Sequence, residues 1–266
     1  MKTRVISAAV ALAIFIPIII YGGIVFNVVA YLIGLMCLKE FMDAQTKKQE
    51  IPWPVKILAF IAISLIILTD VRAVSLSYSL DYRIISAIFL GLLTPVIIYH
   101  NKDKYSIRDA FYVIGGVLFL GISIALLIML RHISLKLFVF LFIITIITDT
   151  FAYVTGMLIG KHKLIESVSP KKTWEGSIGG TIMGVFASVM FYHTCIDPEF
   201  SVFYLTLICT FLSILGQLGD LAFSAMKRYF GIKDFSNIMP GHGGVLDRLD
   251  SIIFVILGFV FFINIL

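Results

Sequence analysis

Residues 6–38 read ISAAVALAIFIPIIIYGGIVFNVVAYLIGLMCL, a run without one charged side chain. A membrane-spanning helix needs about 20 apolar residues, so this run is too long for one straight span and short for two. Its only break is the Tyr-Gly-Gly sequence at 21–23. The run therefore predicts two spans, 6–21 and 24–38, and leaves a re-entrant hairpin as the alternative.

The rest of the chain has the same apolar character. Its mean hydropathy is +1.04, and only 14% of its 266 residues are charged, whereas roughly a quarter of the residues in soluble domains are charged. This composition excludes a soluble globular protein. A chain of this length could hold about eight to ten spans with short connections, and no sizeable soluble domain fits beside them.

Apolar runs between charged or turn clusters predict nine spans, which are 6–21, 24–38, 53–69, 84–100, 110–130, 135–158, 177–195, 202–224 and 251–266. Cytoplasmic loops carry an excess of Lys and Arg. With nine spans and a cytoplasmic N-terminus, only four of the 21 basic residues fall outside, namely Arg72, Arg83, Arg131 and Lys136. The prediction is an all-α integral membrane protein, a polytopic bundle of about nine transmembrane helices.

We treat residues 1–266 as a single membrane domain. Residues 1–140 are expected to be mainly scaffold, and 141–266 to form the catalytic half, with cytoplasmic loops at 160–176 and 225–250. This expectation rests on the polar residues inside apolar runs, which concentrate in the second half of the chain.

Two aspartates lie inside predicted spans. A carboxylate in a bilayer costs at least ~2.5–3.5 kcal/mol, so its default explanation is functional. Helical spacing places Asp149 on one face with Tyr153, Gly156 and Gly160, and it places Asp220 on one face with Gly216, Ser224 and Lys227. The alternative, which stays open for both, is a position at the water boundary.

Small residues recur every four positions at Gly176, Gly180, Gly184 and Ser188. This spacing lets another helix approach closely, which favours a packing role over a chemical one.

The first predicted cytoplasmic loop contains SVSPKKTWEGS at 167–177. Ser169 before Pro170 indicates either a helix N-cap with proline at the first helical position or an extended turn. Lys171 and Lys172 would then stand beside free backbone donors. The alternative is that adjacent lysines here only signal topology.

The second loop contains PGHGGVLDRLD at 240–250. Its glycines permit close approach of a ligand, and they end where the last helix begins, where free N–H groups favour an anion. Asp247 and Asp250 share one face of that first turn, with Arg248 between them in sequence. A segment that attracts both a cation and a phosphate indicates a metal–phosphate site, because Mg²⁺ is usually held by one or two carboxylates plus substrate phosphates.

Together these residues resemble the signature of the integral-membrane phosphatidate cytidylyltransferases, also called CDP-diacylglycerol synthases. The matching positions are Ser224, Lys227-Arg228, Lys233-Asp234, the PGHGG segment at 240–244 and Asp247-Arg248-Leu249-Asp250. Upstream, Asp149 with Ala152-Tyr153, and Ser169-Pro170-Lys171-Lys172-Thr173 with Glu175-Gly176, are similar to further family segments. The resemblance covers the C-terminal half well and the N-terminal half only by hydropathy.

The resemblance implies that the phosphate of phosphatidic acid attacks the α-phosphorus of CTP, which releases pyrophosphate and leaves CDP-diacylglycerol in the bilayer. It implies Mg²⁺ as cofactor, with ligands among Asp220, Asp247, Asp250 and Asp149, and it leaves open a second, monovalent cation. The implied catalytic residues are Asp220, Asp247, Lys227, Arg248 and His242. The implied substrate-binding residues are Ser169, Lys171, Lys172, Thr173, Glu175, Ser224, Arg228, Lys233, Gly241, Gly243 and Gly244.

The implied place of action is the cell's inner membrane, with the site facing the cytoplasm. A homodimer is suggested by the resemblance, and no nucleic-acid partner is expected.

Two alternative functions predict different sequence patterns. An ion-coupled transporter also uses intramembrane carboxylates and broken helices, but it predicts matched polar breaks in two halves, and none occur here. A different transferase acting on lipid phosphates, such as a CDP-alcohol phosphotransferase, would carry several spaced aspartates. This sequence has only one short aspartate motif of this kind, Asp247-x-x-Asp250.

Overall fold

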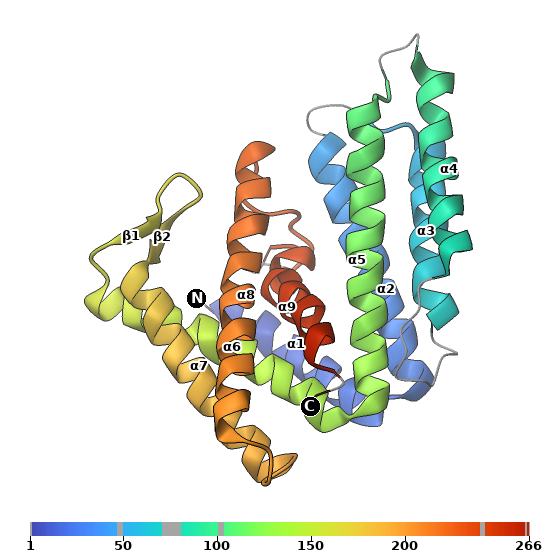
Figure 1. Ribbon diagram of the computed structural model, residues 1–266. Helices are drawn as coiled ribbons and strands as arrows, with labels where there is room; N and C mark the ends of the chain where they lie inside the picture. Colours follow the sequence, from blue (N-terminus) through green and yellow to red (C-terminus); the bar gives the residue numbers. More distant parts are fainter. Residues whose placement is uncertain are drawn as a thin grey trace. The chain divides into compact units, whose positions relative to one another are not determined.

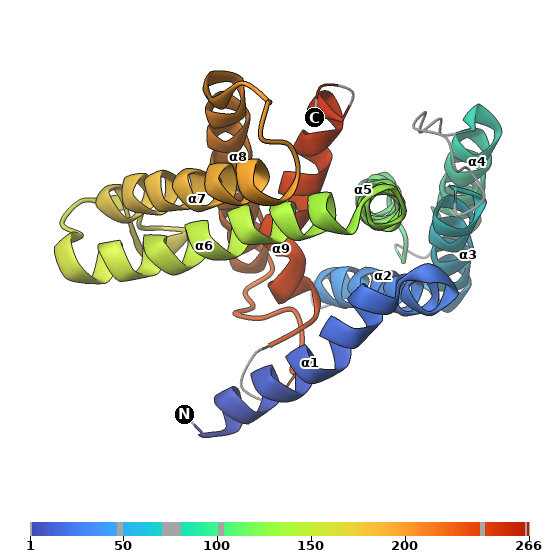
Figure 2. The same ribbon diagram turned by 90° about the horizontal axis from the view of Figure 1, so that it is seen from below.

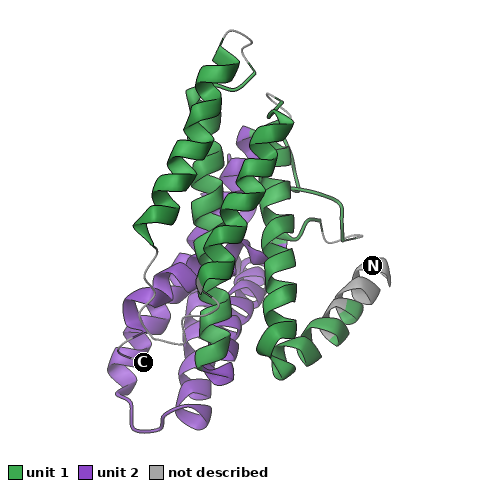
Figure 3. Ribbon diagram, turned by 90° about the vertical axis from the view of Figure 1, so that its right-hand side faces the viewer, with its two compact units in different colours: residues 1–133, 230–247 green, residues 134–229, 248–266 purple. Residues whose placement is uncertain are grey.

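The computed structural model describes residues 2–46, 50–70, 81–100, 104–239, 243–263 and 265. These ranges contain nine α-helices, one short antiparallel hairpin and a terminal 3-10 turn (Figure 1). The chain divides into two compact units, coloured separately in Figure 3: unit 1 is 1–133 with 230–247, and unit 2 is 134–229 with 248–266. The predicted helical class is confirmed, apart from the hairpin, which the sequence analysis did not include.

Unit 1 contains the first five helices: α1 (Lys2–Tyr21), α2 (Gly23–Thr46), α3 (Trp53–Asp70), α4 (Tyr82–Tyr99) and α5 (Ile107–Ile133). The predicted break in the first apolar run is confirmed at Gly22 and Gly23, whose φ angles are 68° and 54°, a region that favours glycine. Arg131 at the end of α5 donates to the carbonyl oxygens of Ile19 at 2.6 Å and Ile20 at 2.9 Å. These bonds satisfy carbonyls at the end of α1 that have no partner inside the helix.

Helix α2 continues to Thr46, although the apolar run was expected to end at residue 38. The charged pair Lys39-Glu40 ends the apolar run but does not end the helix, because neither residue opposes helical geometry. Glu40, Phe41 and Met42 are buried inside unit 1. The ring of Phe41 stacks on Tyr112 of α5 with a centroid distance of 4.3 Å.

Unit 2 contains α6 (Leu135–Ile159), β1 (Lys163–Ile165), β2 (Ser169–Thr173), α7 (Trp174–Cys195), α8 (Val202–Tyr229), most of α9 (Leu246–Phe259) and the turn η2 (Val260–Phe262). Helices α6 and α7 lie side by side in Figures 1 and 2. The small-residue stripe of α7 faces α6. A Cβ added at Gly176 would lie 2.6 Å from the carbonyl oxygen of Ala152, and one at Gly180 would lie 2.5 Å from that of Thr148.

The expected packing role of the stripe is therefore confirmed. Ser188 at its far end is fully buried. Large apolar side chains two residues along from the stripe are exposed, namely Ile178, Ile182, Phe186 and Met190. A helix with one face buried by small residues and another face of exposed apolar side chains suits a position between protein and lipid.

Six helices in the described ranges are long and apolar enough to cross a membrane: α2, α4, α5, α6, α7 and α8. Helix α3 carries a shorter apolar stretch, and α9 has only 14 residues. These helices support a multi-pass membrane protein. The count of nine spans and the cytoplasmic N-terminus stay predictions.

The close contact of α6 with α7 predicts that alanine is tolerated less well at Gly180, inside the contact, than at Gly115 of α5, outside it. Gly180→Ala should destabilise the protein by about 1–3 kcal/mol, because its methyl group would overlap the backbone and side chain of α6. Gly115→Ala on α5 should be neutral or stabilising by up to about 1 kcal/mol, because its added Cβ meets no atom within 4 Å. Thermal unfolding of both variants in the same detergent measures the difference. An equal or higher midpoint for Gly180→Ala would contradict the packing.

Candidate functional site

Three carboxylates from three helices gather in unit 2. Asp149 lies on α6, Asp220 on α8 and Asp250 near the start of α9. The charges of Asp149 and Asp250 each interact with that of Asp220 and with one another. The structure thus brings together three of the four predicted metal ligands.

Two lysines face this group, which we call the carboxylate cluster (Asp149, Asp220 and Asp250). The Nζ atom of Lys172 lies 2.5 Å from Oδ2 of Asp220, with 27% and 29% of the two side chains exposed. Lys227 is buried, and its charge interacts with Asp250. The pairings offset part of the repulsion among the carboxylates.

Two serine side chains form hydrogen bonds with the cluster. Ser224 donates to Oδ1 of Asp220 at 3.3 Å, which fits the face predicted for α8. The side chain of Ser251 forms a hydrogen bond with Asp149. Sequence reasoning missed Ser251, because the only signal was its position next to Asp250, and its partner on α6 lies about a hundred residues earlier in the chain.

The two adjacent lysines of the first loop have different surroundings. They lie in β2, where successive side chains point to opposite sides of the strand. Lys172 reaches Asp220, whereas Lys171 is exposed and forms no ion pair in the part of the chain that the structure describes. The structure therefore separates two residues to which the sequence analysis gave one role.

The loop that carries these lysines is a β-hairpin rather than the start of a helix. Ser169 pairs with Ile165 across the two strands, so it is not a helix N-cap, and of the two alternatives only an extended conformation agrees with the structure. Helix α7 is capped instead by Thr173, whose side chain accepts a hydrogen bond from the N–H of Gly176 at 3.1 Å. Arg228 of α8 donates to the carbonyl oxygen of Val168 at 3.3 Å and ties the hairpin turn to that helix.

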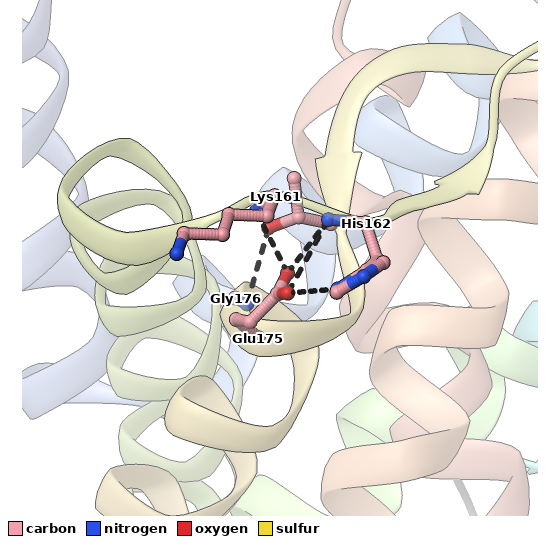
Figure 4. Close-up of polar contacts among 5 residues, drawn as sticks. Lys161, His162, Glu175 and Gly176 are labelled. Carbon is pink, nitrogen blue, oxygen red and sulfur yellow. Dashed lines mark hydrogen bonds and ion pairs between the residues drawn. The ribbon is translucent and has the colours of Figure 1, made fainter.

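Glu175 closes the base of the hairpin (Figure 4). Its carboxylate accepts hydrogen bonds from the N–H of Lys161 at 3.1 Å and from that of His162 at 3.2 Å, and it lies 2.6 Å from Nδ1 of the His162 ring. These contacts hold the first residues after α6 against the first turn of α7. Glu175 therefore anchors the hairpin, and its role in substrate binding stays a prediction.

In unit 1, the described residues of the signature loop (230–239 and 243–247) fold around Asp247. Oδ2 of Asp247 accepts the N–H of Phe235 at 2.9 Å and that of Gly244 at 3.0 Å. Gly243 has a φ of 84°, which favours glycine, and it pairs with Met239 in an isolated β-bridge. The predicted metal ligand Asp247 therefore also organises the loop that precedes α9.

A second carboxylate meets the same loop. Glu40 of α2 accepts the N–H of Val245 at 3.0 Å, the N–H of Leu246 at 2.8 Å and the hydroxyl of Ser236 at 2.5 Å. Only 2% of Glu40 is exposed. Sequence reasoning missed this residue. Its only sequence signal was an acidic residue next to Lys39 at the end of an apolar run, and the sequence does not show where its partners lie.

These bonds change the expectation for phosphate binding at the start of α9. The sequence predicted free N–H groups there that would favour an anion. In the structure, the N–H groups of Gly244, Val245 and Leu246 already donate to Asp247 and Glu40. These three N–H groups are bonded to carboxylates of the protein itself, so they are not free to bind a phosphate.

The remaining predicted residues of the signature have simpler positions. Lys233 in unit 1 and Arg248 in unit 2 are exposed. Gly241 and His242, predicted to line the nucleotide, lie outside the described residues.

The carboxylate cluster offers the donor chemistry of a Mg²⁺ site. Within the described ranges, no group of three or more His, Cys, Asp and Glu side chains is placed so that it could hold a metal ion. Mg²⁺ does not require one, because it is usually bound through one or two carboxylates, with waters and substrate phosphates completing its octahedron. Asp220 fits such a role best, since it interacts with both other carboxylates, Lys172 and Ser224.

Comparison with known proteins places this arrangement in context. The model of the "Cytidylyltransferase family" matches residues 2–266. The chain is 37% identical to the phosphatidate cytidylyltransferase of Staphylococcus haemolyticus, 36% to that of Staphylococcus epidermidis and 34% to that of Staphylococcus aureus. Each match covers 96% of this chain and 96% of the relative.

The bonds of Glu175 predict that the hairpin loosens when its carboxylate is removed. In Glu175→Gln, the neutral amide accepts more weakly from Lys161 and His162, so trypsin should cut after Lys161 and Lys163 several-fold faster than in the unchanged protein. Glu166→Gln is the matched control, because Glu166 is exposed in the same hairpin. Cleavage rates followed by mass spectrometry at low trypsin provide the measurement, and equal rates in both variants would refute the anchoring role.

Proposed function

The chain belongs to the cytidylyltransferase family, and we propose that it is the membrane enzyme that joins CTP and phosphatidic acid to form CDP-diacylglycerol and pyrophosphate. One observation carries the proposal: relatives named phosphatidate cytidylyltransferase are 34–37% identical to it along 96% of its length. The similarity includes the N-terminal half, where the sequence alone offered only hydropathy.

The proposed reaction needs little covalent help from the protein. An oxygen of the phosphatidate phosphate forms a bond to the α-phosphorus of CTP, and the bond from that phosphorus to the bridging oxygen of pyrophosphate breaks. A phosphate monoester has its second pKa near 6, so it is largely ionised at neutral pH and requires no general base. Catalysis then consists mainly of positioning and of offsetting charge on the phosphates.

The cationic side chains of unit 2 suit that task. Lys172 and Lys227 lie beside the carboxylate cluster, while Arg228 and Arg248 are exposed on α8 and α9. Lysine provides a point charge and arginine a planar fork for phosphate oxygens. We assign Lys172 and Lys227 to the reacting phosphates and the two arginines, with Lys233 of the signature loop, to the triphosphate and the lipid headgroup.

Mg²⁺ is part of the proposal, with Asp220 as the principal ligand and Asp149 and Asp250 beside it. Bound there, the ion would offset negative charge on the phosphates. Asp247 is retained as a further proposed ligand, although its Oδ2 already accepts two backbone N–H groups. We make no assignment for a monovalent cation.

We further propose that the N-terminus and the active site face the cytoplasm of the cell's inner membrane. The distribution of Lys and Arg along the chain supports this orientation, because it leaves few basic residues in the opposite loops. A homodimer is the assembly that the family resemblance suggests. Cysteine labelling of loops in intact cells, and mass measurement in detergent, test these two points separately.

Purified protein supplied with labelled CTP, phosphatidic acid in mixed micelles and Mg²⁺ should convert the label into a lipid-soluble product and release pyrophosphate in equal amount. Omitting phosphatidic acid, or chelating the metal with EDTA, should stop both products. Failure to form any lipid-soluble cytidine compound under these conditions would overturn the proposed function. Turnover that persists in EDTA would remove the metal from it.

The different surroundings of the two lysines predict different effects on turnover. Lys172→Ala should lower kcat/KM by roughly 10- to 100-fold, because a hydrogen bond to a charged group contributes about 1.5–3 kcal/mol. Lys171→Ala should stay within about twofold. The partly exposed ion pair of Lys172 contributes only about 0–1 kcal/mol to stability, so both variants should unfold at similar temperatures. Equal activities of the two variants would show that Lys172 has no special contact with the phosphates.

A further inference from the structure

Glu40 binds a segment that lies about two hundred residues later in the chain. Its three hydrogen-bond partners, Ser236, Val245 and Leu246, are 196 to 206 residues away in sequence. All three belong to the signature loop of unit 1. The helix that carries Glu40 comes from the half of the chain that the sequence analysis treated as scaffold.

The surroundings of Glu40 show what balances its charge. The described residues contain no cationic side chain that forms an ion pair with it. Instead its two oxygens accept from the N–H groups of Val245 and Leu246, at the point where α9 begins. The first N–H groups of a helix have no partner within the helix and carry partial positive charge. Glu40 therefore occupies the place that a bound anion would take at this helix start.

The close approach of Glu40 also accounts for a glycine of the signature. A Cβ added at Gly244 would lie 2.5 Å from Oε2 of Glu40, so a side chain at this position would displace the carboxylate. The N–H of Gly244 meanwhile donates to Asp247. Two carboxylates, one from α2 and one from α9 itself, thus fix consecutive N–H groups from Gly244 to Leu246.

The opposite end of the loop is attached to the same region. Phe230 packs edge-on against Tyr112 at 5.5 Å, and Tyr112 stacks on Phe41, the residue next to Glu40. The hydroxyl of Tyr112 donates to the carbonyl oxygen of Phe41 at 2.8 Å. The loop is therefore held at both ends by residues 40–41 of α2 and their neighbour on α5.

We propose that Glu40 is a positioning residue of the reaction: its carboxylate holds the signature loop, as far as the first residues of α9, in the conformation that presents Asp247. The role of Glu40 in the reaction rests on the proposed function, but its hydrogen bonds to the signature loop do not. Glu40 has no contact with substrate in this scheme. It acts only through the backbone that it binds.

The decisive variant is Glu40→Gln, which keeps the shape of the side chain but replaces one acceptor oxygen with an NH₂ group. That group would face a backbone N–H, so Val245 or Leu246 loses its acceptor. Glu50→Gln is the matched control, because Glu50 is exposed in the same unit. Ser236→Ala is a milder second variant that removes one bond and leaves the carboxylate in place.

The first measurement is hydrogen exchange of the protein alone, which needs no turnover. In Glu40→Gln, amides in peptides covering 243–247 should exchange roughly tenfold faster or more, since they lose a bond to a charged acceptor. Amides of α5 away from Tyr112 should exchange as before. Ser236→Ala should shift the same peptides by a smaller factor, and Glu50→Gln should shift none. Unchanged exchange at 243–247 would overturn the loop contact whatever reaction the protein catalyses.

The second measurement is steady-state turnover with CTP and phosphatidic acid. We expect kcat of Glu40→Gln to fall by at least about tenfold, because a misplacement of about 1 Å can cost about 100-fold in rate. Any rise in KM, through Lys233 of the same loop, should be smaller than the fall in kcat. Faster exchange with normal kcat would overturn the positioning role, and so would a rise in KM alone. If Glu40→Gln unfolds, the same two measurements are made on Ser236→Ala. Unchanged exchange at 243–247, or faster exchange with normal kcat, would then overturn the proposal. If the unchanged protein shows no turnover, the proposed function is wrong. The hydrogen-exchange result for the contact between Glu40 and the loop would still hold.

Discussion

A carboxylate in the apolar interior of a protein is stable only if hydrogen bonds or cations replace the water that it has lost. This protein meets that constraint in two ways. Asp220 in unit 2 lies against the ammonium group of Lys172 and the hydroxyl of Ser224. Glu40 and Asp247 in unit 1 are bound by backbone N–H groups of the signature loop. The ion pair of Asp220 is partly exposed, whereas Glu40 and Asp247 are buried.

That difference limits where substrate phosphates can bind. Backbone donors at a helix start are the usual anion site when they are free, but here those of Val245 and Leu246 belong to Glu40. In the proposed function, side-chain cations bind the phosphates instead. Lys172 is suited to this role, because an ammonium group on a flexible stem can leave Asp220 for a phosphate oxygen when a divalent ion offsets the carboxylate charge. The pair could then separate without leaving either charge unbalanced.

The sequence was informative wherever a property is local. Apolar run length predicted the helices, and the four-residue spacing from Gly176 predicted close packing of α7. The spacing around Asp220 correctly placed Ser224 beside it. The sequence failed where structure depends on distant partners: Glu40 binds residues of the signature loop, and the strand conformation of Ser169 depends on pairing with Ile165. Neither relation leaves a periodic signal, so only the folded chain shows it.

Two glycines near the end of α6, Gly156 and Gly160, connect helix packing to the candidate site. At the C-terminal end of α6, a Cβ added at Gly156 would lie 2.9 Å from Oγ1 of Thr173, and one at Gly160 would lie 2.7 Å from the same atom. The absence of side chains at these positions therefore lets Thr173 sit against α6 and cap α7 through Gly176. Lys172 directly precedes that cap in β2. Its approach to Asp220 thus depends on how closely the two helices pack, so glycines that allow the packing also determine where the charge of Lys172 can lie.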